Sequence, residues 1–244
     1  MKLTVFLLAI TSANLGFAKE IETKEFDSSG LSEIQVENLS GKVTITSSDN
    51  SKSNSKTIVT ATKNKFSSNC KLTIEKPESK LLVKVQYFGF MNISDCDVDF
   101  TINVPKTVNV NVINNSGDIR VTGIQGELEY KVGSGDVTAD GEIKNIKGIS
   151  GSGDITLKGI SGGGELKTGS GEINLTFTNN KMSGEIDIIS GSGGVTALFP
   201  KGTLIKTNFK AGIGELTNEL GDSPNAKFKL SMKTGSGYLN VKAY

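Results

Sequence analysis

A short acidic motif recurs along this chain with a spacing that could support chemistry. It runs glycine, acid, then Ile or Val, and its copies are Gly117-Asp118-Ile119, Gly135-Asp136-Val137, Gly153-Asp154-Ile155 and Gly171-Glu172-Ile173. If these segments stack in register, the side chains of Asp118, Asp136, Asp154 and Glu172 form one column, about 5 Å from one to the next. Like charges at that distance repel each other, so some interaction must offset the repulsion.

Three interpretations of the acidic column are possible. Calcium takes several oxygen ligands, but the nine-residue calcium repeat Gly-Gly-x-Gly-x-Asp places its aspartate differently, so the match is poor. Clustered carboxylates on a β-helix could also belong to a carbohydrate-active enzyme. Alternatively, each carboxylate accepts hydrogen bonds from the backbone N–H groups of its own corner. The motif favours the third interpretation, with Asp118, Asp136, Asp154 and Glu172 retained as weak calcium candidates.

The composition excludes several classes of site. The 244 residues contain no histidine, which rules out the Ser/His/Asp triad and histidine-bound zinc. Lys and Arg number 27 against 26 for Asp and Glu, and Arg120 is the sole arginine, so a nucleic-acid face built on arginine is not expected. Aromatic residues are 6% of the chain, with no tryptophan, which argues against a sugar-binding cleft with aromatic platforms. We expect no enzyme and no cofactor.

The N-terminus has the pattern of a secretory signal. Lys2 precedes an apolar run from Leu3 to Ile10, and small residues end at Ala18, so we expect residues 1–18 to be removed after Ala18. No other apolar run is long enough to span a membrane. The protein is then exported, to the periplasm or to the cell surface. In that oxidising compartment Cys70 and Cys96 are expected to form a disulfide, the alternative being two free buried thiols.

Alternating apolar and polar residues predict an all-β fold in two styles. In residues 19–105, short runs rich in Val, Ile and Thr are separated by Asn, Ser, Asp and Gly, which favours an antiparallel or irregular β part. In residues 106–244 the corner motif repeats every 18 to 23 residues, which is typical of a solenoid. We expect six coils between Gly117 and Gly237 to rise roughly 30 Å at the usual strand spacing. Residues 19–244 form one domain in this interpretation.

The repeat explains an uneven distribution of glycine. Of the 29 glycines, 25 lie from Gly117 onward. A corner repeated in every coil needs a positive φ or a close backbone approach, which glycine tolerates at low cost. After each corner two apolar residues flank a polar one, as in Ile155-Thr156-Leu157, so alternate side chains point inward and outward. Most of these glycines are therefore expected to be corners of stacked coils.

The same residues resemble a known bacterial family. Asn103-Val104-Pro105-Lys106, the run Asn115-Ser116-Gly117-Asp118-Ile119 with its later copies, and Glu37-Asn38-Leu39-Ser40-Gly41-Lys42-Val43-Thr44-Ile45 are similar to an adhesin-like family of unknown function related to the head-GIN domains. The resemblance covers about Ile34 to the C-terminus. It implies an exported, single-domain, right-handed parallel β-solenoid, and it carries over no catalytic residues.

Together these observations predict an exported, non-enzymatic binding or structural module. Its expected partner is a polymer or protein of the cell envelope or surface, and adhesion is the leading function. The alternative is a carbohydrate-active β-helix enzyme that uses the stacked acidic column. The sequence identifies neither the ligand nor the oligomeric state.

Overall fold

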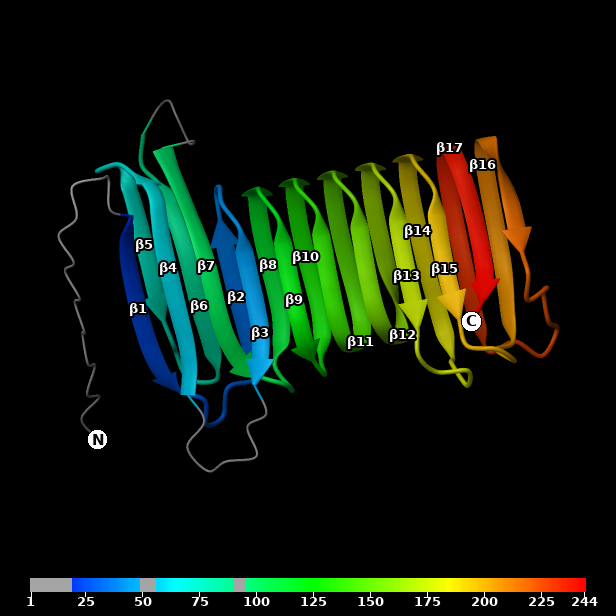
Figure 1. Cartoon of the computed structure of the whole chain (residues 1–244), viewed down its shortest axis with the longest axis horizontal. Coiled ribbons are helices and arrows are strands. Elements are labelled where there is room, and N and C mark those ends of the chain that lie inside the picture. Colours follow the sequence, from blue (N-terminus) through cyan, green and yellow to red (C-terminus); the bar gives the residue numbers. More distant parts are fainter. Residues whose placement is uncertain (1–18, 49–55, 90–94) are drawn as a thin grey trace.

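The protein is an elongated stack of β-strands, described here from a computed structural model (Figure 1). The described residues are 19–48, 56–89 and 95–244, so the expected signal at 1–18 lies outside them. All seventeen strands belong to one sheet, and no helix occurs among the described residues. That part of the chain accordingly has no helix long and apolar enough to cross a membrane. The expectation of an all-β, solenoid-like fold is confirmed.

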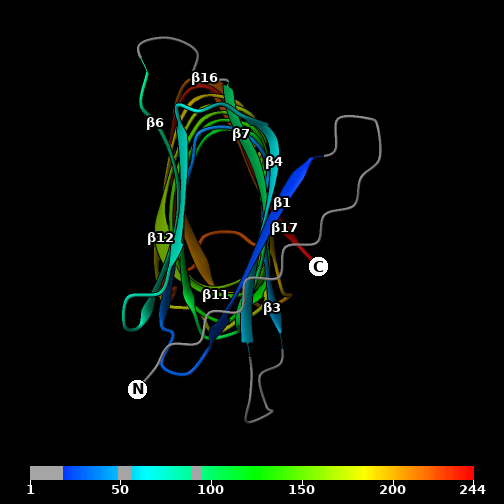
Figure 2. The same ribbon diagram turned by 90° about the vertical axis from the view of Figure 1, so that its left-hand side faces the viewer.

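The strands form the two long sides of an oval that closes on itself when viewed from the end (Figure 2). One side, the threonine face, is built from β1 (Glu20–Asp27), β4 (Lys56–Phe66), β7 (Cys96–Pro105), β3 (Val43–Ser48), β9 (Ile119–Ile124), β11 (Val137–Ser152), β12 (Ile155–Ser170), β13 (Ile173–Phe177), β15 (Val195–Phe199), β17 (Phe228–Ala243) and β16 (Ile205–Asn218). The opposite face is built from β5 (Cys70–Glu75), β6 (Lys80–Tyr87), β2 (Glu33–Asn38), β8 (Asn109–Ser116), β10 (Glu127–Ser134), β11, β12, β14 (Gly184–Ser192), β17 and β16.

The four strands β11, β12, β16 and β17 bend around an edge of the oval and so contribute to both faces. Neighbouring coils are parallel and in register. Leu128 pairs with Ile146, and Ile146 with Gly164, residues 18 apart in each case. The later offset from Gly164 to Ile186 is 22 residues. The corner motif therefore lies at the same position around every coil, directly above the corner of the coil before it.

The core is a set of apolar columns inside the oval. In every coil except the outermost one, β16, the residue two places after the corner glycine is fully or almost fully buried, as is the next inward residue; the first column contains Val43, Ile119, Val137, Ile155, Ile173, Val195 and Leu239. Near the C-terminal end, the rings of Phe177 and Phe199 stack at 4.2 Å, and Phe228 packs edge-on 5.4 Å from Phe177. This burial of stacked aliphatic and aromatic side chains stabilises coils that could not fold singly.

At both ends, the coils do not stack in sequence order. The coil β2–β3 lies between β6–β7 and β8–β9, so the segment 33–48 is part of the parallel stack. At the other end β17 lies between β14–β15 and β16. At the C-terminus the last coil in the sequence is therefore the second-to-last in space.

The N-terminal end is partly antiparallel, as the sequence predicts. The pairs β1–β4, β4–β7 and β5–β6 are antiparallel. The strands β6 and β7 then join the parallel stack through β2 and β3. Pro105 is the last residue of β7, in keeping with its missing backbone donor.

Candidate functional site

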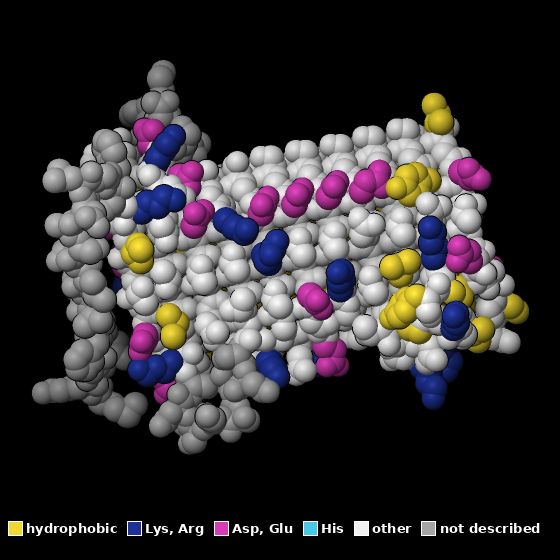
Figure 3. All heavy atoms as spheres, viewed as in Figure 1, with side chains coloured by type: hydrophobic (Ala, Val, Ile, Leu, Met, Phe, Trp, Pro, Cys, Tyr) yellow, Lys and Arg dark blue, Asp and Glu magenta, His cyan; other side chains and the backbone are white. Residues whose placement is uncertain are grey.

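The acidic side chains do form a row along one edge of the stack (Figure 3). Each lies directly after a corner glycine, and each accepts a backbone hydrogen bond from the next coil. The Asp118 carboxylate accepts from the N–H of Asp136 at 3.1 Å, and Asp136 accepts from the N–H of Asp154 at 2.9 Å. Asp154 accepts from the N–H of Glu172 at 2.9 Å. The hydrogen bonds thus run between coils, and the prediction that they lie within one corner is wrong.

The two ends of this acidic column are closed by other residues. At one end Lys42 follows Gly41 in the corner, and its N–H donates to the Asp99 carboxylate at 2.8 Å. At the other end Glu172 accepts from the N–H of Gly194 at 3.2 Å and from the hydroxyl of Tyr238 at 2.6 Å. The pKa of Tyr238 is raised, first by this hydrogen bond and then by partial burial.

The contact between Tyr238 and Glu172 spans a coil because Gly194 has no side chain. A Cβ at Gly194 would lie 2.2 Å from the Tyr238 ring, so the ring lies flat over that glycine. The repeat in the sequence does not predict this contact. The sequence does contain an indication of it, because Gly194 occupies the position at which the earlier copies of the motif have an acid.

Among residues 19–48, 56–89 and 95–244, no three or more Asp, Glu, Cys or His side chains gather as metal ligands. One carboxylate oxygen of each of Asp118, Asp136 and Asp154 is already used by a backbone N–H. This arrangement favours hydrogen bonding over calcium as the interaction that offsets the like-charge repulsion.

The threonine face carries a second column beside the acidic one. It is formed by outward residues that pair with one another from strand to strand, between two buried positions in every strand except β1 and β16. The column is largely threonine or asparagine: Thr23, Thr60, Thr101, Thr44, Arg120, Thr138, Thr156, Asn174, Thr196, Asn240 and Thr217. Every member is partly or fully exposed. The sequence repeat reveals the central part of this column. It cannot reveal Thr23, Thr60 or Thr101, whose strands lack the corner motif.

The opposite face holds a shallow depression away from the acidic column. It is lined by Glu33, Asn109, Val110, Asn111, Glu127, Leu128, Glu129, Asn145 and Lys147, and it has a volume of about 290 Å³. Lys147 forms an ion pair with Glu129 at 3.1 Å, and Lys80 pairs with Glu33 at 2.9 Å. None of the four acids of the predicted column lines this depression.

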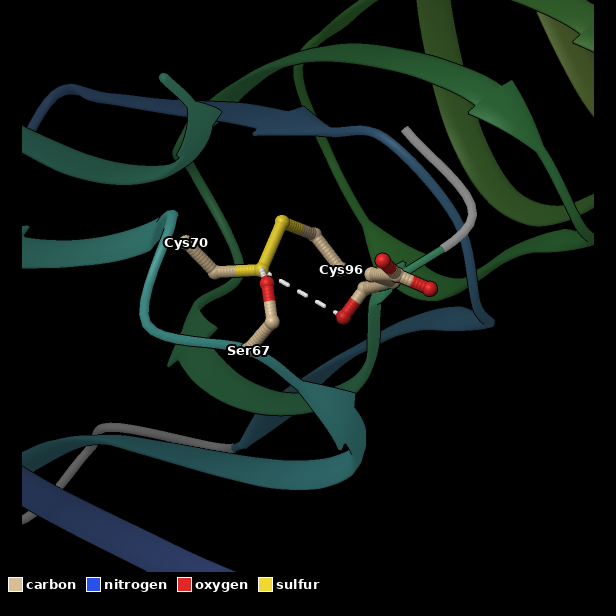
Figure 4. Close-up of a disulfide and its surroundings, with 4 residues drawn as sticks. Ser67, Cys70 and Cys96 are labelled. Carbon is tan, nitrogen blue, oxygen red and sulfur yellow. Dashed lines mark hydrogen bonds between the residues drawn. A yellow bond between two sulfur atoms is a disulfide. The ribbon is translucent and has the colours of Figure 1, made fainter. Parts of the chain in front are cut away.

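Cys70 and Cys96 form a disulfide, as predicted (Figure 4). It joins β5 on the opposite face to β7 on the threonine face, at the N-terminal end. The Ser67 hydroxyl lies 3.4 Å from the Cys70 sulfur. A structural disulfide is typical of proteins outside the reducing cytosol.

A family model and several solved structures match this chain. No curated protein matches the chain. Three solved structures are similar: a "putative cell adhesion protein" from Clostridium sporogenes ATCC 15579 (12% identity, covering 93% of this chain and 100% of that one, TM-score 0.41), a "putative adhesin" from Bacteroides fragilis NCTC 9343 (14%, 91% and 98%, 0.38) and a "putative adhesin" from Parabacteroides distasonis ATCC 8503 (15%, 92% and 98%, 0.36). The model of one family, Toastrack DUF4097, matches residues 14–242. The chain therefore belongs to the Toastrack DUF4097 family.

Proposed function

We propose that this protein is an exported, non-enzymatic binding module whose threonine face binds an extended, uncharged polysaccharide of the cell envelope or surface. The observation that carries the proposal is the threonine column, which presents hydroxyl or amide groups in register on ten of eleven neighbouring strands, with Arg120 on the remaining one. Successive strands are about 4.8 Å apart. A periodic row of hydrogen-bonding groups suits a periodic, extended ligand better than a compact one.

The chemistry of the neighbouring column narrows the ligand class. Hydroxyl and amide side chains both donate and accept hydrogen bonds, whereas carboxylates only accept. Asp118, Asp136, Asp154 and Glu172 therefore favour a ligand rich in donors, such as sugar hydroxyl groups. They repel phosphates and nucleic acid, since like charges raise the cost of contact.

A polysaccharide-binding assay with matched variants tests the proposal. Thr138→Lys and Thr156→Lys place a long charged side chain on the threonine face. Asn111→Lys and Asn145→Lys make the same change at outward strand positions of the opposite face. On an array of envelope and surface polysaccharides, we expect the first pair to lose binding and the second pair to keep it.

Other results would contradict it. If no polysaccharide is retained by the unsubstituted protein, the proposal fails. If the Asn111 and Asn145 variants lose binding while the threonine variants keep it, the depression on the opposite face is the binding site. In both cases circular dichroism must show that the variants retain their β-structure.

The alternative is a carbohydrate-active enzyme that uses the acidic column. It requires carboxylates free to transfer protons, whereas those of Asp136 and Asp154 accept backbone hydrogen bonds. We expect no release of sugar from a polysaccharide panel. Activity that disappears in an Asp136→Asn, Asp154→Asn variant would favour the enzyme.

Export and the finer features of the fold form part of the same proposal. The disulfide supports a location outside the cytosol, and the signal over residues 1–18 with cleavage after Ala18 supports export. We expect the coils to be right-handed, because parallel strands are joined by right-handed connections in nearly all proteins. The relation to the head-GIN domains remains a prediction from the repeated Gly-Ser-Gly-Asp-Ile motif.

A further inference from the structure

The two ends of the stack are finished differently. At the N-terminal end β1 carries Glu22 and Lys24, which lie 3.6 Å apart, and Lys63 of β4 lies 3.3 Å from Glu22. The Lys63 side chain is only 10% exposed. Charged side chains at a sheet edge oppose pairing with another strand, so this end is protected.

The C-terminal end is formed by β16, which pairs with β17 and with no other strand of the described residues. A following segment covers the beginning of its outer edge. There Ser223 donates its N–H to the Ile205 carbonyl at 2.9 Å, and the Asp222 carboxylate accepts from the N–H of Thr207 at 2.9 Å. Within the described chain no strand pairs with the outer edge of residues 208–217. Such an unpaired edge is a template for another strand.

The side chains of β16 also differ from those of the inner coils. The residue before each corner glycine is serine at Ser116, Ser134, Ser152, Ser170, Ser192 and Ser236, but β16 has Ile213 there. Ile213 is 78% exposed, and Leu216 is 39% exposed. On the outermost coil Ile213 thus replaces a serine, and Leu216 exposes an apolar position that is buried in the inner coils. Exposed apolar residues of this kind are expected of a contact surface.

The orientation of the free backbone groups can be inferred. Thr207 directs its N–H to the outer edge, so the strand alternation directs those of Phe209 and Ala211 there too. Beyond the corner, Ile155 donates its N–H to Glu172 of the next coil. Leu216 occupies the same place relative to its corner glycine, so its N–H also faces outward.

We propose that β16 binds the β16 of a second copy in an antiparallel pair, which joins two stacks end to end about a twofold axis near Gly212 and Ile213. In the register that the charges select, Lys210 lies opposite Glu215 of the second copy, and Phe209 lies opposite Leu216 of the second copy. Each contact occurs twice. The residues that direct backbone groups to the free edge then face each other, as an antiparallel ladder requires.

The occupant is a second copy because β16 is complementary to itself. Inward residues meet inward residues and outward residues meet outward residues in this register, which one strand of unrelated sequence would not provide. The twofold axis also brings the two exposed Ile213 residues next to each other. An interface in which the same patch contacts itself closes as a dimer and does not extend into a fibre.

Charge reversal tests this arrangement. Lys210→Glu places two glutamates opposite each other twice, and Glu215→Lys does the same with lysines. We expect each variant alone to raise the dimer Kd roughly tenfold or more, because like charges directly opposite on a sheet are destabilising. An equal mixture of the two variants, and the double variant, restore opposite charges, so both should dimerise as the unsubstituted protein does.

Sedimentation velocity of the purified protein gives the readout, with Lys131→Glu, on the outward side of β10, as the matched control. The control should remain dimeric. The proposal is overturned if the unsubstituted protein stays monomeric up to roughly 1 mM, the limit of a weak specific interface. It is also overturned if dimers form but both single variants leave them unchanged, or if only an added peptide, and no second copy, binds to β16.

Discussion

At the scale of single residues, Asp118, Asp136 and Asp154 link each coil to the next. The repeated acid looks like a reactive group in the sequence, yet its oxygen is used by a backbone N–H 18 residues further along the chain. The motif identifies which residues lie in one column. The motif does not show that each carboxylate bonds to the neighbouring coil, because that depends on where the N–H of that coil lies relative to the carboxylate.

Removal of one such link should weaken the stack measurably. Asp136→Ala leaves the N–H of Asp154 without its partner, and we expect the free energy of unfolding in urea to fall by about 0.5–1.5 kcal/mol. Asp136→Asn keeps an oxygen acceptor and removes one negative charge from the column. It should be at least as stable as the unsubstituted protein.

Metal removal provides the control for this account. A chelator should leave the melting temperature of the unsubstituted protein unchanged, because the repulsion is offset by backbone N–H groups. A melting temperature that falls with chelator and recovers with calcium would instead restore Asp118, Asp136, Asp154 and Glu172 as calcium ligands.

Tyr238 makes stability depend on pH in the alkaline range. Its hydrogen bond to Glu172 raises its pKa in the folded state above the ordinary value of about 10. The bond therefore stabilises the fold at all pH values below about 10, and the stabilisation is lost as the pH rises through the higher folded pKa.

The matched variant is Tyr238→Phe, which keeps the ring over Gly194. It should be less stable than the unsubstituted protein at neutral pH, and the difference between their melting temperatures should shrink above about pH 10. A difference that stays constant from neutral pH to alkaline pH would show that the hydroxyl contributes nothing through its proton.

At the scale of elements, the glycine corners allow successive coils to stack closely. Gly153 has a φ of 117°, and a Cβ there would lie 2.2 Å from the Gly135 carbonyl oxygen. Both the conformation and the close approach require glycine. The sequence predicts these corners well, since the requirement is local and recurs in each coil.

A comparison of two glycines separates the two requirements. Gly153→Ala introduces both an unfavourable positive φ and a steric clash with the neighbouring coil. Gly202→Ala introduces only the first, because Gly202 has a φ of 80° with no atom within 4 Å of an added Cβ. We expect Gly202→Ala to lower the free energy of unfolding by about 1 kcal/mol and Gly153→Ala by about 3 kcal/mol or more. Equal losses in urea unfolding would mean that stacking at the corner contributes little.

At the scale of the whole molecule, the sequence predicts the coil but not the order of the coils. Every corner fits every other corner, so the repeat alone cannot place β17 inside β16. The inward residues carry the missing information. In β17 they include Phe228, Leu230 and Met232, all buried, whereas the residues of β16 that pair with them are the buried Ile205, the polar Thr207 and a partly buried Phe209. The more apolar coil takes the inner place.

For a related reason the sequence does not predict that β2 and β3 form a coil of the parallel stack. The strands β2 and β3 pair with β8 and β9, which lie 76 residues further along the chain. Only one copy of the corner, at Gly41, precedes that gap. A single copy gives no period, so the sequence predicts an antiparallel or irregular β part for all of residues 19–105. The strands β2 and β3 nevertheless have the same inward columns as the later coils.

The most direct test of the central claim is the dependence of affinity on ligand length. Eleven strands on the threonine face give ten spacings of about 4.8 Å, or roughly 48 Å. For oligosaccharides of one polysaccharide that the protein binds, isothermal titration calorimetry should show a Kd that falls with each added sugar until the chain spans roughly that length. A Kd that is independent of length, or unchanged by Thr138→Lys and Thr156→Lys, would contradict binding along the threonine column.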